Sequence, residues 1–459
     1  MPLPAPHVSA LTALVGADAV RDSSALAALD PGVDARNFGA GLMLRPRDTA
    51  AVARVLAYCN REGIGVVPQG GRTGLSGGAE SHPGEVILSL ERLNAIESLD
   101  PVSRTAVVGA GVTLGALAEQ AGTHGLAPGV DLGARDSATL GGMISTNAGG
   151  NAAFRHGTMR DRVLGLEAVL ADGTVLQALG RVRKRNEGLA LEQLLIGAEG
   201  TLGVVTRAAL ALVPADGPAA TALIAVPDLA AAVVLCDAVQ REAALTPLAI
   251  ELMSGNHVAT TCRAHGAPEF ATLATAPYLV LLEASAATGA AEAGLTDCLG
   301  SLAERGAIAD ALVAQSEAQR RAIWRLREDW AVDRERPGGL WYDVSVPLAA
   351  LPGYLADCAA ALAAHDASLT LFVIGHLADG NLHLTVNATV PITERYAEIA
   401  PLLTDGLAAL GGSFSAEHGI GLEKKALLAR LASPARLALM RTVKSALDPR
   451  GIMNPGKVL

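Results

Sequence analysis

Three glycine-rich segments between residues 68 and 205 place the strongest constraint on how this chain folds. They are PQGGRTGLSGG at 68–78, a long stretch at 128–150, and IGAEGTLGVV at 196–205. Glycine lets the backbone approach a ligand closely and turn its N–H groups toward an anion. A lone glycine cluster is most often only a tight turn. Three clusters so close together favour loops that wrap a phosphate-bearing ligand.

Two familiar glycine motifs are not matched. GAGVTLG at 109–115 is one residue longer than the dinucleotide-binding fingerprint, and Asp131, the acidic residue at suitable spacing, lies in a predicted loop. The P-loop pattern GxxxxGK[ST] does not occur. The sequence therefore disfavours a Rossmann NAD site and a P-loop nucleotidase.

Composition narrows the class of protein further. A chain of 459 residues is long for one core and suits two or three domains, and 50% hydrophobic residues exclude a disordered chain. A net charge of −10 disfavours nucleic acid as a partner. Five scattered cysteines without a CxxC motif, and no positive charge before Arg21, predict a cytoplasmic protein. The apolar run 219–235 is interrupted by Pro227 and Asp228, which disfavours a membrane span, although peripheral membrane contact stays open.

The residue pattern changes near position 215. Before it, residues 44–69 predict strand, helix and strand, with Asp48 or Thr49 as the helix cap, and 169–176 predict a hairpin with an Asp-Gly turn. After it, alanine-rich helical patterns alternate with strands at 279–283 and 370–375, and the tail from 423 is helical. The helical patterns cover 228–243, 287–304, 312–334, 349–364 and 390–410. The pattern predicts an α+β protein.

Six segments in order carry a resemblance to a known family: PQGGRTGLSGG, DLGARDSATLGGMISTNAGG, IGAEGTLGVVT, GHLADGNLH, SAEHGIG and DPRGIMNPGK. With them, the chain from about residue 40 onward resembles the FAD-linked oxidases of the vanillyl-alcohol oxidase type, in their D-2-hydroxyacid dehydrogenase branch. The resemblance implies an FAD-binding domain of two α/β subdomains (1–215). It also implies a cap domain of antiparallel sheet and helices with a metal site (216–422), and a segment that closes the FAD site (423–459).

The resemblance also implies which residues hold FAD. The predicted cofactor residues are Pro68, Gly70, Gly71, Arg72, Thr73, Gly74, Gly77, Gly78, Thr139, Gly142, Thr146, Asn147, Gly149, Gly150, Glu199, Gly200, Val204 and Asn454. Some relatives attach FAD through a histidine or cysteine of these loops. Residues 68–78 and 139–150 contain neither, so we expect FAD to be bound non-covalently.

The segment GHLADGNLH at 375–383 contains an Asp-Gly pair, which favours a two-residue hairpin turn. A turn centred on Asp379 and Gly380 would pair His376 with His383 on one face, close enough to share a metal. Buried histidines without a metal are the alternative from spacing alone. The resemblance implies that His376, His383 and Glu417 bind a divalent metal, Zn²⁺ or alternatively Mn²⁺, and that His418 is a catalytic histidine beside the substrate.

Residues 320–332 predict one helix on which Trp324, Arg327 and Ala331 share a face. Arginines of such a helix are most often solvated. The resemblance nevertheless implies that Arg327 is a catalytic residue that binds the substrate carboxylate, with Trp341, Tyr342, Asn381 and His418 also around the substrate.

Three positions depart from relatives specific for 2-hydroxyglutarate. Those relatives carry lysine at the place of Trp341, threonine near Ala331 and asparagine near Thr385. Replacing lysine by tryptophan removes a cation and adds apolar surface, which disfavours a second buried carboxylate. We therefore expect a D-2-hydroxy acid with an apolar side chain, such as D-lactate, a branched D-2-hydroxy acid or D-mandelate.

The predicted activity is oxidation of this acid to the 2-oxo acid by hydride transfer to flavin N5, with a metal polarising the hydroxyl. The alternatives are a D-2-hydroxyglutarate dehydrogenase and an alcohol oxidase of the same superfamily. A non-enzymatic FAD-binding module and a structural metal-binding protein are further rivals. The resemblance implies an electron-transfer flavoprotein or a quinone as electron acceptor, and we expect a homodimer.

Overall fold

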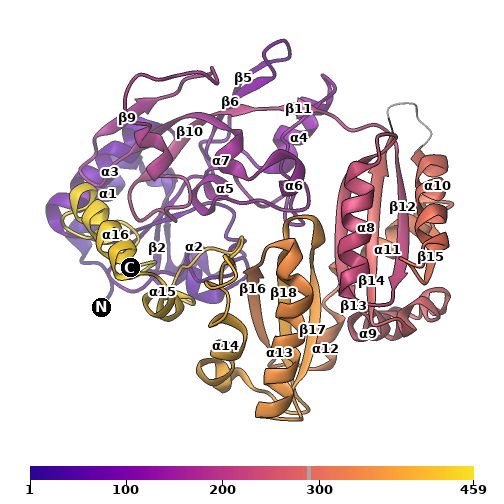
Figure 1. The fold of residues 1–459 in the computed structure, drawn as a ribbon. Coiled ribbons are helices and arrows are strands. Elements are labelled where there is room, and N and C mark those ends of the chain that lie inside the picture. Colours follow the sequence, from indigo (N-terminus) through magenta and orange to yellow (C-terminus); the bar gives the residue numbers. More distant parts are fainter. Residues whose placement is uncertain (287–290) are drawn as a thin grey trace. The chain divides into compact units, whose positions relative to one another are not determined.

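The computed structural model describes residues 1–286 and 291–459 (Figure 1). These residues form two compact units. The N-terminal unit consists of residues 1–215 and 417–459, and the central unit of residues 216–416. The chain thus leaves the first unit once and returns to it for its last 43 residues.

A four-stranded sheet forms the first half of the N-terminal unit. Its order is β1 (Val20–Asp22), β2 (Leu42–Leu44), β4 (Val86–Ser89) and β3 (Val66–Gln69), with β2, β4 and β3 parallel. Helix α3 (Thr49–Glu62) connects β2 to β3, and the Asp48 carboxylate caps it by accepting from Ala51 N–H. The predicted strand, helix and strand are confirmed, and β3 delivers the chain into the first glycine loop.

A five-stranded antiparallel sheet forms the second half. Its order is β5 (Ile96–Asp100), β6 (Thr105–Gly109), β10 (Val204–Ala211), β8 (Val163–Val169) and β9 (Val175–Ala178). The pairing of Val169 with Val175 confirms the predicted Asp-Gly hairpin. Helices α4 (Leu114–Gly122) and α5 (Leu140–Thr146) contribute buried side chains to the same apolar cluster as β6, β8 and β10.

The C-terminal segment completes the N-terminal unit. Helices α15 (Lys425–Leu431) and α16 (Pro434–Leu447) lead to residues 452–454. Val66 N–H donates to the Ile452 carbonyl at 2.8 Å, and Met453 bridges to Val66 in parallel. The last residues therefore cover the edge of β3, beside the start of the first glycine loop.

The central unit is built on one antiparallel sheet of seven strands. Their order is β15 (Asp310–Val313), β12 (Ala219–Val226), β14 (Tyr278–Ser285), β13 (Thr246–Ser254), β17 (Thr370–His376), β18 (Asn381–Asn387) and β16 (Leu340–Ser345). On one face, helices α9 (Gly255–His265) and α11 (Glu317–Glu328) form an apolar cluster with the strands. Helices α8 (Leu229–Arg241) and α13 (Leu351–His365) lie in front of the strands in Figure 1, and α10 (Ala291–Glu304) packs on β12 and β15.

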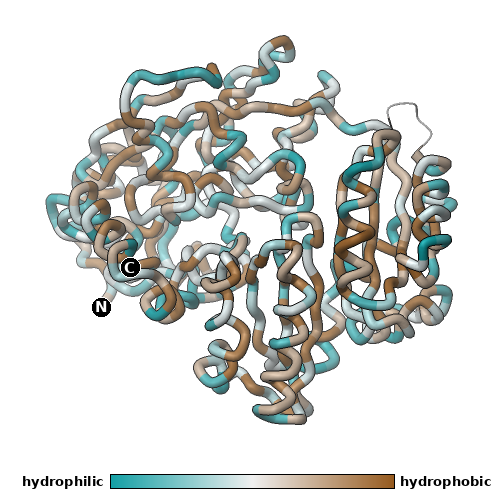
Figure 2. The backbone as a smooth tube through the Cα atoms, in the orientation of Figure 1, coloured by the Kyte–Doolittle hydropathy of each residue, from teal (hydrophilic) through white to brown (hydrophobic). Residues whose placement is uncertain are grey.

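The apolar run 219–235 is divided between β12 and α8 at Pro227 and Asp228, as predicted. Figure 2 shows both elements largely in brown. Among the described residues, one stretch, Leu348–His365, is long and apolar enough to cross a membrane by length and composition. Most of that stretch is α13, whose Leu351, Leu355 and Leu362 are buried within the central unit.

Two helix predictions need correction, and a third reaches the undescribed residues. The pattern 312–334 is not one helix: α11 ends at Glu328, and the short α12 (Ala331–Glu335) follows. The helix stops because the extended Asp329 turns its carboxylate to His265 and Arg334. Ala331 therefore does not continue the face of Trp324 and Arg327. The pattern 390–410 shortens to α14 (Tyr396–Thr404), and the first four residues of the predicted helix 287–304 lie outside the described residues.

Candidate active site

The first glycine loop begins where β3 ends and lies against the second glycine-rich segment. Gln69 fixes its base, since its side-chain amide donates to the carbonyls of Asn37 and Ala79 at 2.7 and 2.8 Å. A Cβ on Gly70 would lie 2.2 Å from Thr139 Oγ1, and one on Gly71 only 1.9 Å from the Ser137 carbonyl oxygen. Only glycine permits the two loops to pack so closely.

The predicted cofactor residues concentrate the strained backbone of the chain. Six non-glycine residues in the described ranges have positive φ, and four of them are Arg72, Asn147, Glu199 and Asn454. Such conformations persist only where the surroundings enforce them, and they cluster at ligand sites. All four belong to the N-terminal unit, which supports one shared binding site there.

Glu199 ties the third glycine-rich segment to the C-terminal part of this unit. Its partly buried carboxylate accepts from the backbone N–H groups of Ile420 and Gly421 at 2.7 and 2.8 Å. Burial raises the pKa of Glu199, and these two N–H groups offset part of that rise. Asn454 completes the link, because its amide donates to the carbonyls of Glu199 and Gly78 at 2.7 and 2.9 Å.

The first glycine loop also holds the backbone of the predicted catalytic histidine. The Ser76 hydroxyl donates to the His418 carbonyl at 2.9 Å, and Leu422 N–H donates to the Ser76 carbonyl at 2.8 Å. His418 thereby lies beside the loop at 68–78 within the N-terminal unit.

The remaining predicted cofactor residues lie along the same loops. Thr146 is on α5, where its hydroxyl donates to the Gly142 carbonyl at 3.1 Å, and the Pro68 ring is 3.1 Å from the Cβ position of Gly200. Thr73, Gly74, Gly77 and Gly78 continue the first loop, Gly149 and Gly150 follow α5, and Val204 opens β10.

Three buried polar atoms in these loops lack a hydrogen-bond partner among the described residues: Gln69 Oε1, Arg72 Nε and Thr139 Oγ1. The Arg72 guanidinium lies over the Phe38 ring at 5.2 Å from its centroid. Buried polar groups are normally paired, so unpaired ones that line glycine loops indicate a bound polar group. These residues fit the phosphates and ribose of FAD.

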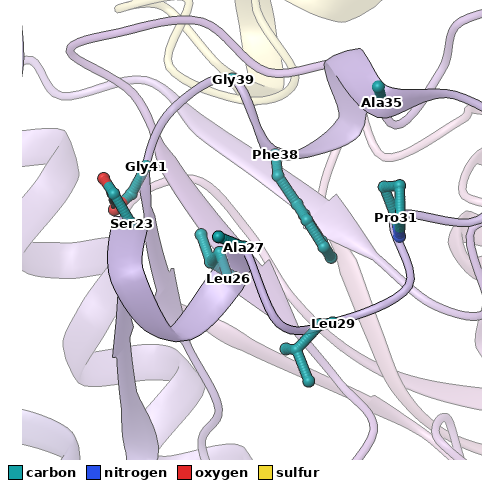
Figure 3. Close-up of a pocket in the computed structure, with 9 residues that line it drawn as sticks. All are labelled: Ser23, Leu26, Ala27, Leu29, Pro31, Ala35, Phe38, Gly39 and Gly41. Carbon is teal, nitrogen blue, oxygen red and sulfur yellow. Dashed lines mark hydrogen bonds between the residues drawn. The ribbon is translucent and has the colours of Figure 1, made fainter.

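A cavity of about 380 Å³ lies behind Phe38, between α2 (Ser23–Leu26) and the chain up to Gly41 (Figure 3). None of the nine described residues that line it carries a charged side chain. The hydroxyl of Ser23, its one side-chain polar group, is already bonded to the Gly41 carbonyl. The cavity therefore offers no catalytic group.

The histidine hairpin of the central unit has a different register from the one we predicted. His376 lies opposite Asn381, and His383 lies opposite Ile374. The prediction that His376 pairs with His383 across a two-residue turn is wrong, because Leu377–Asp379 forms a 3-10 turn closed by left-handed Gly380. The register shift is two residues, and side chains alternate with a period of two, so both histidines still share one face. Their ring centroids are 5.5 Å apart.

Asp343 joins the histidines on this face from the neighbouring strand. Asp343, in β16, lies opposite His383, and 3.8 Å separates one of its carboxylate oxygens from His383 Nδ1. Its oxygens also accept from Asn381 Nδ2 at 2.9 Å and from Ala416 N–H at 3.0 Å. Asn381, predicted to bind substrate, thus uses its amide to hold Asp343.

Glu251 in β13 connects the predicted substrate arginine to a predicted metal ligand. Its buried carboxylate accepts from Arg327 Nε at 2.8 Å and from His376 Nδ1 at 2.9 Å. Burial alone would raise the pKa of Glu251, but the charges of His376 and Arg327 outweigh it and lower the pKa. The sequence prediction missed Glu251, although a lone charge within an apolar strand is a signal, since buried charges are normally paired.

A second buried carboxylate, Glu283 in β14, lies on the same face. It accepts from Arg320 twice, at 2.7 and 2.9 Å, and from Trp324 Nε1 at 2.9 Å. Trp324 therefore anchors the helix α11 to the sheet. Burial raises the pKa of Glu283, but these hydrogen bonds lower it overall.

The aromatic residues near the predicted site divide between the two faces of the sheet. Trp341 is on the histidine face, opposite Thr385, and its ring lies 4.8 Å from that of Trp330. Tyr342, predicted to bind substrate, points to the opposite face, where it is buried and stacks on Tyr396 at 5.4 Å. Adjacent residues of a strand face opposite sides, so Tyr342 does not join the histidines.

Glu417, the third predicted metal ligand, opens the returning part of the N-terminal unit. It directly follows Ala416, the last residue of the central unit, whose backbone Asp343 holds.

The N-terminal unit has glycine loops with unpaired buried polar groups. The sheet of the central unit carries two histidines, and an arginine of α11 is bonded to the same glutamate as one of them. These features are those of an FAD-linked oxidoreductase. The chain matches the FAD binding domain over residues 40–178 and the C-terminal domain of FAD linked oxidases over 217–458. It belongs to the FAD-linked oxidase family, and it is an enzyme. The resemblance stated from the sequence is confirmed.

Relatives with established names cover most of the chain. It is 38% identical to D-2-hydroxyglutarate dehydrogenase of Xanthomonas citri pv. viticola, over 90% of this chain and 88% of that protein. The mitochondrial D-2-hydroxyglutarate dehydrogenase of Bos taurus is 36% identical, with 91% of this chain and 76% of that protein covered. A putative mitochondrial D-lactate dehydrogenase of Schizosaccharomyces pombe is 34% identical, with 91% and 81% covered.

Solved structures confirm the α+β fold of the vanillyl-alcohol oxidase type. An alkyldihydroxyacetonephosphate synthase superposes with a TM-score of 0.74 at 17% identity, over 99% of this chain and 86% of that one. A p-cresol methylhydroxylase superposes with a TM-score of 0.72 at 17% identity, over 100% and 98%. At these identities the likeness concerns the fold alone.

Proposed function

We propose that this enzyme is an FAD-dependent dehydrogenase that oxidises a D-2-hydroxy acid to the 2-oxo acid. The observation that carries the proposal is the carboxylate of Glu251, which holds His376 and Arg327 together on one sheet face. A cation site beside a carboxylate-binding arginine suits the hydroxyl and carboxylate of a 2-hydroxy acid. FAD, when bound, supplies the acceptor for the hydride of the substrate carbon.

The residues of the central unit would bind and orient the substrate. Nε of Arg327 is used by Glu251, and its two terminal nitrogens have no other partner among the described residues, so they suit a substrate carboxylate. His376, His383 and Glu417 would hold a divalent metal, Zn²⁺ or alternatively Mn²⁺, which polarises the hydroxyl when bound. Nδ1 of His376 donates to Glu251, so Nε2 is the ring nitrogen that would bind the metal.

His418 would accept the hydroxyl proton as general base. The supporting observation is that Ser76 holds its backbone beside the first glycine loop. A base next to the cofactor loops suits this reaction, because the substrate carbon gives up a hydride while the oxygen bound to it gives up a proton.

The substrate class follows from three positions that cluster in the central unit. Trp341 is the direct cross-strand partner of Thr385, and Trp330, whose ring contacts Trp341, directly precedes Ala331. All three departures from the 2-hydroxyglutarate pattern thus lie at or next to the contact between Trp330 and Trp341. We propose that the two half-exposed indoles contact an apolar side chain, as in D-lactate, a branched D-2-hydroxy acid or D-mandelate.

The names of the relatives favour a second candidate, D-2-hydroxyglutarate. A cation would then have to replace the missing lysine, and Arg336 over the Phe372 ring is available on the same face. The ratio of kcat/KM for D-2-hydroxyglutarate to that for D-lactate and D-mandelate distinguishes the candidates. A clear preference for the dicarboxylate would contradict the apolar substrate class.

The remaining parts of the proposal concern cofactor and partners. FAD would be bound non-covalently, and an electron-transfer flavoprotein or a quinone would accept the electrons of a cytoplasmic homodimer. The first experiment is to purify the protein, record its visible spectrum, and screen D-2-hydroxy acids with an artificial dye as acceptor. Rapid H₂O₂ release under air without a dye would instead indicate an alcohol oxidase.

A further inference from the structure

Glu251 makes two contacts that no other residue of the described chain makes together. One carboxylate oxygen accepts from Nε of Arg327, and the other accepts from Nδ1 of His376. Glu251 is 1% exposed and lies directly opposite His376 in the sheet. Its two partners are the groups that we propose for the substrate carboxylate and for the metal.

Each contact fixes its partner in the orientation that its role needs. An ionised carboxylate only accepts hydrogen bonds, so His376 carries its proton on Nδ1, and this tautomer makes Nε2 the ring nitrogen that can bind a metal. Arg327 donates one N–H, that of Nε, to Glu251, and its terminal N–H groups do not bond to that carboxylate. The same carboxylate thereby fixes the orientation of both side chains.

A second arginine of α11 and a second glutamate of the sheet form a pair that presents no groups to a ligand. Arg320 precedes Arg327 by two helical turns on α11, and it too meets a buried glutamate of the sheet, Glu283. Arg320 uses both Nε and Nη2 on Glu283, whose oxygens also accept from Trp324 and Thr221. That network satisfies itself, so it ties α11 to the sheet without presenting groups to a ligand.

We propose that Glu251 is a positioning residue that couples the metal site to the substrate arginine, so that disturbing this one carboxylate weakens both metal binding and substrate binding. The inference rests on the proposed function, because it takes His376 as a metal ligand and Arg327 as the group that binds the substrate carboxylate.

The test uses the full-length FAD-bound protein and the variants Glu251→Gln and Glu251→Asp. Glutamine keeps the shape but loses the charge and one of the two acceptor contacts, whereas aspartate keeps the charge and shortens the reach. We expect the dissociation constant for Zn²⁺, measured by chelator competition, to rise about 10- to 100-fold in Glu251→Gln. With Zn²⁺ saturating, we expect KM for the hydroxy acid to rise about tenfold or more.

Glu283→Gln is the control, since it removes another buried carboxylate that holds an arginine of the same helix. It is expected to lower the thermal midpoint but to leave the Zn²⁺ affinity and KM unchanged. If Glu251→Gln folds poorly, Glu251→Asp decides: raised Zn²⁺ dissociation constant and raised KM support the coupling. A folded Glu251 variant with a wild-type Zn²⁺ dissociation constant and a wild-type KM would overturn the coupling. Equal increases of both quantities in Glu283→Gln would overturn it as well.

His376→Ala separates this inference from the proposed function. A wild-type protein that binds one Zn²⁺ and loses it in His376→Ala supports the metal site, whatever Glu251 does. A wild-type protein that binds no metal contradicts the proposed function and the coupling with it. Normal Zn²⁺ binding in both wild type and Glu251→Gln contradicts the coupling alone.

Discussion

Trp341 in β16 lies directly opposite Thr385 in β18, on the face of the sheet that carries His376 and His383. The indole N–H of Trp341 donates to the Asp333 carboxylate at 2.7 Å, and its ring contacts Trp330. The indole that we propose contacts the substrate is therefore held in a defined orientation.

Replacing Trp341 by lysine should shift the substrate preference. A lysine would restore a cation for a second carboxylate and remove apolar contact area, so the kcat/KM ratio of D-2-hydroxyglutarate to D-mandelate should rise roughly 10- to 100-fold. Steady-state assays with a dye acceptor measure it. Tyr342→Phe, on the opposite face, serves as control and should leave the ratio unchanged. An unaltered ratio in Trp341→Lys would refute the assignment of this position to specificity.

His376→Ala should lower kcat by about a hundredfold or more while the flavin absorbance stays intact, because the proposed FAD loops all belong to the other unit. Visible spectra and dye-linked turnover test both halves of this expectation. His365→Ala removes a surface histidine of the same unit, paired with Glu398, and should keep normal turnover. A fully active His376→Ala protein contradicts a metal role for His376.

Asn454→Ala should weaken FAD binding. The Asn454 amide connects the carbonyls of Gly78 and Glu199, and losing it leaves two partly buried acceptors unsatisfied. Leaving such an acceptor unsatisfied costs about 1–3 kcal/mol, so the FAD dissociation constant should rise about 10- to 100-fold. Flavin fluorescence after dialysis measures this constant. The matched control is Asn256→Ala, which removes an amide bonded to the Leu371 carbonyl in the central unit. Equal FAD loss in both variants would argue against a local role.

Acid should destabilise the central unit through His257. This buried histidine donates from Nε2 to the Leu326 carbonyl at 3.0 Å, near Arg327 and Asp329. Burial lowers its pKa from 6.5 to about 4. The unfolded chain therefore takes up the proton first, so stability present above pH 6.5 is lost as the pH falls toward 4, by up to about 3 kcal/mol.

His257→Gln keeps a donor for the Leu326 carbonyl but does not titrate. Its thermal midpoint should fall less steeply between pH 6.5 and 4 than that of the wild type, measured by circular dichroism in matched buffers. Parallel curves for the two proteins would show that His257 does not contribute.

Much of the fold is legible in short stretches of sequence. Asp48 caps α3, and the Asp-Gly pair at 172–173 closes the β8–β9 hairpin, because these effects depend on a few neighbouring residues. The second Asp-Gly pair, at 379–380, misled the prediction, since Gly380 ends a longer turn and shifts the register by two residues. Turn length depends on how the strands pack, which local sequence does not specify.

The sequence by itself determined the glycine loops, the order of the family segments and the candidate histidines and arginine. Only the tertiary structure revealed Glu251, whose partners Arg327 and His376 lie 76 and 125 residues away along the chain. It also decided that Asp343 joins the histidine face whereas Tyr342, its neighbour, does not. The physical reason is that a buried charge is stabilised by whatever the fold brings within about 3 Å, and strand pairing across long separations sets those neighbours.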